Sequence, residues 1–179
     1  MALTQVNEFG FSGYEHHWWA YNGSQGLSAN SADVLTSFTT LHDVSNAHHS
    51  DYKQLGNTSF TQSSGIFTFP RTGTWKIHFV LNLNDNDAAS RHINAYIDIS
   101  SDSGSNYVQF NGGYGQFGYL ASSQNNYAQV DATRLVNVTN ASTFRCRFRG
   151  FSNTAIDTVM SYSVQGFSNV TFERIGESQ

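Results

Sequence analysis

The segment from Trp75 to Leu83 constrains the fold most, because a large apolar residue occupies every second position in it. Period-two alternation of this length predicts a β-strand with one face on a hydrophobic core. A shorter apolar run, Ile66 to Phe69, precedes it, and Pro70-Arg71-Thr72-Gly73 lies between the two. Because Pro fixes φ at an early turn position and Gly tolerates positive φ, this spacing predicts a β-hairpin.

The rest of the chain repeats the pattern of short alternating segments separated by turns. His92 to Ser100 alternates, and Ser101 to Asn106 is a clear turn after it. Val130 to Val138 and Thr143 to Phe148 are predicted to pair across a short corner, and Ser161 to Ile175 is predicted to be a long closing strand. No segment has helical periodicity, so the sequence predicts an all-β, two-sheet sandwich.

The run Gly65-x-Phe67-Thr68-x-Pro70-x-x-Gly73-x-Trp75-x-Ile77-x-Phe79 resembles the signature of the complement C1q-like and tumour-necrosis-factor-like jelly rolls. The aromatic residue after Gly73 stands where that family usually has Tyr or Trp, and the likeness extends over residues 32–176. The resemblance implies a two-sheet jelly-roll sandwich that assembles as a homotrimer. The chain has no Gly-x-x repeat and therefore no collagen-like stalk, which argues against complement-type signalling.

Composition narrows the class of protein. At 179 residues the chain fits one domain with a core of its own. Charged residues make up 12% of the chain, against a typical share of about 25%, and the net charge of -4 argues against nucleic acid as a partner. Cys146 lies between Phe144 and Phe148, which favours a packed thiol.

Because no signal peptide and no apolar membrane span are visible, we expect a protein made in a host cytoplasm without a membrane partner.

Residues 1–31 differ from the rest, and we expect them to form an N-terminal aromatic arm and linker before a jelly-roll domain at residues 32–179. The segment from Phe9 to Tyr21 is rich in aromatic and histidine side chains without clear periodicity. Left exposed, such a segment would aggregate, so it must be buried against its own sandwich, a sister subunit or another protein. Folding back and docking on a partner both stay open, with docking favoured. The candidate partner-binding residues are Phe9, Phe11, Tyr14, His16, His17, Trp18, Trp19 and Tyr21.

A second candidate site lies in the glycine-aromatic stretch from Asn111 to Leu120, which we expect to be a loop. Its glycines permit irregular backbone, while Tyr114, Phe117 and Tyr119 offer contact surface for a ligand such as a host surface glycan. Such a role requires these rings to be exposed, because rings that belong to the core cannot meet a ligand.

Three arginines are predicted to share one strand face. Arg145, Arg147 and Arg149 alternate with apolar residues from Phe144 to Phe148. Like charges in a row usually form a solvated face, and the alternative is pairing with acidic residues of a neighbouring subunit or partner.

Neither a metal nor a cofactor is expected. Asn82 to Asp87 gathers oxygen ligands of the kind that Ca²⁺ prefers, but it lacks the Asp-x-Asp-x-Asp-Gly loop and its later Glu. That departure favours a plain hydrated turn. His16-His17 and His48-His49 are adjacent pairs whose side chains would point to opposite faces of a strand, so neither pair chelates by itself.

No nucleophile, zinc-protease or phosphate-loop motif occurs, so we expect no enzymatic activity. The favoured interpretation is a structural protein of a tailed-bacteriophage virion: a trimeric capsid decoration, or cement, protein that docks through its arm on the major capsid protein or another virion protein. The jelly-roll resemblance, the lack of an export signal or disulfide, and the low-charge composition favour it. The alternative is a receptor- or glycan-binding head domain of a phage tail fibre or capsid fibre.

Overall fold

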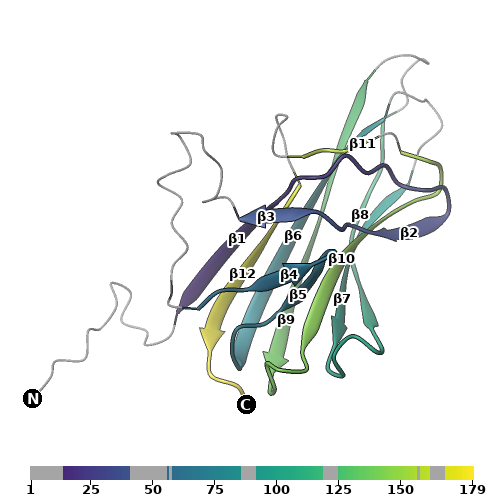
Figure 1. The fold of residues 1–179 in the computed structure, drawn as a ribbon. Coiled ribbons are helices and arrows are strands. Elements are labelled where there is room, and N and C mark those ends of the chain that lie inside the picture. The colour runs from purple at the N-terminus through teal and green to yellow at the C-terminus, as the bar shows by residue number, and fades with distance from the viewer. Residues whose placement is uncertain are drawn as a thin grey trace, which may run out of the picture.

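The computed structural model describes residues 14–40, 56, 58–85, 92–118, 125–156, 158–161 and 168–179. These residues form two antiparallel β-sheets packed face to face, an all-β jelly-roll sandwich (Figure 1). The strands are β1 (Glu15–Tyr21), β2 (Ser31–Val34), β3 (Phe38–Thr40), β4 (Thr61–Ser63), β5 (Ile66–Thr68), β6 (Gly73–Asp85), β7 (Ile93–Ser100), β8 (Val108–Gly115), β9 (Asn126–Val138), β10 (Arg145–Ser152), β11 (Thr158–Val159) and β12 (Asn169–Gly176). Among these residues there is no helix of the length and apolarity needed to cross a membrane.

Each sheet gathers strands from distant parts of the chain. One sheet, which we name the β6 sheet, has the order β3-β1-β12-β6-β9, and β11 pairs with the end of β6 beyond β12. The other, the β10 sheet, has the order β4-β5-β10-β7-β8. At one side of the sandwich β8 packs beside β9. Gly112 and Gly113 allow this approach, because a Cβ at either position would meet β9.

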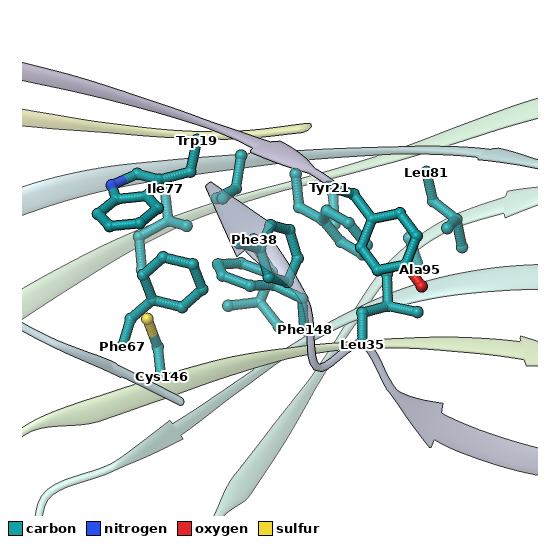
Figure 2. Packing of buried hydrophobic residues seen from close by; sticks show 14 of the residues in the cluster. Trp19, Tyr21, Leu35, Phe38, Phe67, Ile77, Leu81, Ala95, Cys146 and Phe148 are labelled. Atoms are coloured by element: carbon teal, nitrogen blue, oxygen red, sulfur yellow. The ribbon is translucent and has the colours of Figure 1, made fainter. Parts of the chain in front are cut away.

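The alternation from Trp75 to Leu83 is confirmed, because the large apolar side chain at every second position of this segment is fully buried. Aromatic rings from both sheets surround them: Phe60 stacks on Phe172 with 4.1 Å between ring centroids and meets Trp75 edge-on at 5.2 Å. In Figure 2, Trp19 from β1 lies above Phe67 from β5, and their centroids are 5.3 Å apart. Such pairs contribute about 0.5–1.5 kcal/mol each beyond their buried area, so the rings hold the two sheets together.

Two predicted strand pairings are wrong. β5 pairs with β4 and β10, whereas β6 pairs with β9 and β12, so Pro70–Gly73 carries the chain from one sheet to the other instead of closing a hairpin. β9 and β10 likewise lie in different sheets. The physical reason is backbone hydrogen bonding: β9 pairs with β6 along its whole length from Gly73 to Asp85, which a three-residue neighbour such as β5 could not match.

The boundary expected at residue 31 between an arm and the sandwich is also wrong. β1 is an inner strand of the β6 sheet, paired with β12 on one side and with β3 on the other. Trp19 and Tyr21 are 8% and 0% exposed. The strand does alternate, but Glu15 and His17 occupy two of its core-facing positions, so no apolar periodicity is visible in the sequence. The described N-terminal residues from Glu15 onward therefore belong to the sandwich.

Cys146 on β10 points into the core, as its alternation with the arginines predicts (Figure 2). Burial raises the pKa of its thiol well above the ordinary value. Because the thiolate is the reactive form, this residue is a packing group and not a nucleophile.

Candidate functional site

Three of the predicted partner-binding residues face the core: His17, Trp19 and Tyr21. His17 Nε2 lies 3.3 Å from Glu15 Oε2, and the other carboxylate oxygen of Glu15 lies 2.6 Å from Arg71 Nε. The Thr58 hydroxyl donates to the same carboxylate. Burial lowers the pKa of His17, and the hydrogen bond to Glu15 opposes that shift. This buried polar group ties β1 to the segments that contain Thr58 and Arg71, so His17, Trp19 and Tyr21 serve the core and are not exposed to a partner.

The remaining described members, Tyr14, His16 and Trp18, are only partly buried. His16 Nε2 lies 4.0 Å from Glu173 Oε1, and Lys76 Nζ lies 3.1 Å from Glu173 Oε2. Burial is the main cause that lowers the pKa of His16, and Glu173 opposes it. Burial likewise raises the pKa of Tyr14. Phe9 and Phe11 lie outside the described residues.

Strand register arranges outward side chains in rows across the β6 sheet. His16, Glu173, Lys76 and Leu135 form one row over β1, β12, β6 and β9. The next row contains Trp18, Thr171, His78 and Thr133. Three large apolar side chains stay exposed on the strands of this sheet: Leu135 (57%), Tyr127 (61%) and Ile175 (50%). A face that combines exposed apolar groups with paired charges is a candidate protein interface.

The three arginines lie on the outer face of the β10 sheet, and two of them pair within the chain. Arg147 Nε lies 2.9 Å from Asp98 Oδ2, and Arg149 Nε lies 2.7 Å from the same oxygen. Arg145 donates from Nη1 to the Phe144 carbonyl at 2.7 Å. Asp98, on the neighbouring strand β7, is 1% exposed. An acidic partner for Arg147 and Arg149 is therefore supplied by β7 of the same chain and not by another subunit.

The stretch expected to be a ligand loop is mostly strand, because β8 continues to Gly115. Tyr114 is 67% exposed, and its ring stacks parallel to that of His92, with 5.6 Å between centroids and 5° between planes. Phe117 is 6% exposed and belongs to the core, which removes it from the predicted site. Tyr119 lies outside the described residues.

Sequence reasoning missed His92, because it precedes β7 and reaches Tyr114 only through the pairing of β7 with β8. It also missed Phe151 of β10, whose ring meets His92 edge-on at 5.8 Å. No local pattern signals either residue, since their neighbours are supplied by three different strands.

A groove of about 390 Å³ lies near the outer edge of the β10 sheet, where β4, β5 and β10 adjoin. Its lining residues are Thr61, Gln62, Ser63, Ser64, Ile66, Thr68 and Arg145. Gln62 fixes the turn between β4 and β5 through its side-chain amide. Its Nε2 donates to the Phe38 carbonyl at 2.9 Å, and its Oε1 accepts from the Gly65 N–H at 3.2 Å. The groove therefore has a rigid, hydroxyl-rich wall.

No group of three or more His, Cys, Asp and Glu side chains in the described ranges is placed to hold a metal ion. The plain turn expected over Asn82 to Asp87 is strand as far as Asp85, which belongs to β6 and is 1% exposed. Asn86, Asp87 and the pair His48-His49 lie outside the described residues.

No protein-family profile and no curated protein matches this sequence, whereas solved structures match its fold. The crystal structure of murine APRIL at pH 5.0 is 6% identical over 90% of this chain and 99% of that chain, with a TM-score of 0.54. Eiger TNF from S. frugiperda is 8% identical over 93% of this chain and 95% of its own, also at 0.54. The PRD1 vertex protein P5 is 14% identical over 91% and 96%, with a TM-score of 0.49.

With so few identical residues, these likenesses concern the fold alone. They confirm the resemblance carried by the run from Gly65 to Phe79: the chain has a tumour-necrosis-factor-like jelly-roll fold. The fold hosts no single function, so function has to be argued from the two outer faces of the sandwich.

Proposed function

We propose that this chain, with its tumour-necrosis-factor-like jelly roll, is a non-enzymatic structural protein of a bacteriophage virion that assembles as a homotrimer. The low-charge, disulfide-free composition and the compact sandwich support this proposal. Its finer form is a capsid decoration protein that attaches to the major capsid protein or another virion protein. In this form of the proposal, the part of the expected arm before Tyr14, which contains Phe9 and Phe11, makes that attachment.

The observation that carries the proposal is the outer face of the β6 sheet. Leu135 and Tyr127 stand exposed on β9 at one side of this face, and Trp18 and His16 stand on β1, with β12 and β6 between them. Full burial of one large apolar side chain is worth about 1.5–3 kcal/mol. Several such side chains in each subunit are enough to drive association.

The separation of the two groups favours a ring. A two-fold dimer joins the same patch on both subunits, whereas a ring joins one patch to a different patch on the next subunit. We propose that the β9 side of one subunit, with Leu135, contacts the β1 side of the next, with Trp18. Three subunits close such a ring without leaving either group exposed.

Native mass spectrometry tests the assembly. The wild-type chain should appear at three times 19.9 kDa. Leu135→Asp should shift it to monomer, because burying a carboxylate in the interface costs the free energy of its hydration. Val108→Asp is the matched control, since Val108 is 61% exposed on the other sheet and Leu135 is 57% exposed. A wild-type monomer at micromolar concentration, or equal dissociation of both variants, would contradict the proposal.

A second candidate function, the receptor- or glycan-binding head, is favoured by one observation. Tyr114 exposes 67% of its surface although its ring is held parallel to His92. An exposed, oriented aromatic ring is costly to leave in water and is suited to stacking on a sugar ring. This surface belongs to the β10 sheet, so it remains available when the β6 sheet is covered.

A further inference from the structure

We infer that the outer face of the β10 sheet binds an acidic polysaccharide, with Arg147 holding a sugar carboxylate between the hydroxyl-lined groove and the Tyr114 ring. This inference rests on the second candidate function and gives its ligand a chemical class. It does not depend on the virion assignment or on the trimer, which concern the opposite face of the sandwich.

The positive charge of this face comes from β10. Arg145, Arg147 and Arg149 alternate along the strand, so their guanidinium groups repeat about every 6.8 Å. Asp98 neutralises one of the three, which leaves two positive charges on this strip of a chain whose net charge is -4. Because the rest of the molecule repels anions, an acidic ligand is directed to this strip.

Arg147 is the arginine placed to hold a carboxylate. Its Nε is directed at Asp98, its guanidinium lies 4.0 Å from the centroid of the Tyr107 ring, and its side chain is 28% exposed. Nη1 and Nη2 make no hydrogen bond with the described part of the chain. A guanidinium that is oriented on one side and open on the other forms paired hydrogen bonds with a carboxylate.

Arg149 and Arg145 already donate hydrogen bonds within the chain from their guanidinium groups. Arg149 reaches both oxygens of Asp98 and also donates to the Gln109 amide oxygen. Arg145 donates from Nη1 and Nη2 to carbonyls of the turn before β10, at 2.7 and 2.9 Å. These two arginines therefore add positive potential to the strip while Arg147 makes the direct contact.

The groove supplies hydroxyl partners beside that contact. Register places Ser63 of β4, Ile66 of β5, Arg147 of β10 and Asp98 of β7 in one row. Ile66 is 36% exposed and gives an aliphatic floor, and hydroxyl groups of the groove surround it. A sugar ring with polar edges and apolar faces matches this combination better than an extended acidic peptide does.

The other end of the strip supplies a stacking surface. Phe151 of β10, Asn94 of β7 and Tyr114 of β8 form a second row, six residues along β10 from Arg145. At about 3.4 Å per residue the two ends are about 20 Å apart, which is room for several sugar units. Asn94 is 5% exposed and donates to the Tyr96 hydroxyl at 2.7 Å, while its Oδ1 accepts no hydrogen bond from the residues that the structure describes. The Tyr114 end thus has an exposed ring for stacking, next to Asn94 in the same row.

Isothermal titration calorimetry of the full chain tests the inference with three polymers: polygalacturonate, neutral dextran and polyglutamate. We expect binding to polygalacturonate alone, and at least a tenfold loss of affinity in Arg147→Gln. Arg134→Gln is the matched control: it removes the same charge from an exposed arginine on β9 and should keep wild-type affinity. Equal melting temperatures of the two variants would show that the loss is one of binding and not of folding.

Each of the other possible binding results would overturn a specific part of the inference. Equal binding to dextran removes the acidic class and leaves the glycan-binding function standing. Equal binding to polyglutamate shows an acidic protein segment to be the ligand and removes the sugar. No binding to any of the three polymers overturns both the inference and the second candidate function, and the trimer test is unaffected by it.

Discussion

Two adjacent tryptophans on β1 should respond to replacement in opposite ways. Trp19 faces the core, is 8% exposed and meets the Phe67 ring edge-on at 5.3 Å (Figure 2). Replacing a buried Trp by Ala costs about 3–5 kcal/mol, from lost transfer free energy and the cavity left behind. For a domain of this size, 1 kcal/mol shifts the melting temperature by about 2–4 °C. Trp19→Ala should therefore lower the melting temperature by roughly 6–20 °C at any protein concentration.

Trp18 lies on the opposite face of the same strand and is partly exposed. Within one subunit, Trp18→Ala should cost only about 1 kcal/mol, since most surface substitutions cost less than core ones. Its main effect should be on assembly, because Trp18 belongs to the proposed subunit contact. Any loss of thermal stability should then depend on protein concentration, as expected when dissociation precedes unfolding.

Thermal unfolding followed by circular dichroism, together with native mass spectrometry, separates the two effects. We expect a destabilised assembly from Trp19→Ala and a stable, dissociated subunit from Trp18→Ala. If Trp19→Ala melts within about 2 °C of the wild type, β1 is not part of the core and residues 1–31 are a detachable arm after all.

Two further predictions follow from buried groups. Burial lowers the pKa of His17 in the folded state below its ordinary value of 6.5, so the unfolded chain binds more protons as the pH falls below 6.5. Stability should thus be full above that pH and decline as the pH falls below 6.5, and the decline should be smaller in His17→Gln when melting temperatures are compared. Cys146 should react with a thiol reagent such as dithionitrobenzoate only after unfolding in guanidinium, because it is fully buried and its thiol pKa is raised. Rapid labelling of the native protein would contradict its placement in the core.

The sequence was informative where side-chain type and burial agree. From Trp75 to Leu83 every second residue is apolar and buried, so the strand and its core face could be predicted from local pattern alone. On β1 the same alternation was hidden, because the inward positions include Glu15 and His17, whose burial depends on Arg71 in a distant segment. A hydrophobicity pattern cannot predict which polar residues are buried, because their burial depends on partners elsewhere in the chain.

Strand pairing and the candidate sites could not be predicted locally. The hairpin expected around Pro70 is a crossing between sheets, since backbone pairing is decided by the long strand β9 and not by the nearest neighbour in sequence. Arg147 and Asp98 are 49 residues apart, and His92 meets Tyr114 only across β7 and β8. The resemblance to the tumour-necrosis-factor-like family gave the fold, because the turn and the alternation after it are local features.

Disulfide trapping between subunits tests the proposed ring most directly. His16→Cys on β1 and Thr133→Cys on β9 are introduced together into one chain, so that the contact residues Trp18 and Leu135 stay in place. The native Cys146 is fully buried and does not compete. If the β9 side of each subunit contacts the β1 side of the next, mild oxidation should give a closed covalent species at three times 19.9 kDa on a denaturing gel. Covalent dimers that never extend to trimers, or chains that stay monomeric under oxidation, would contradict the proposed assembly.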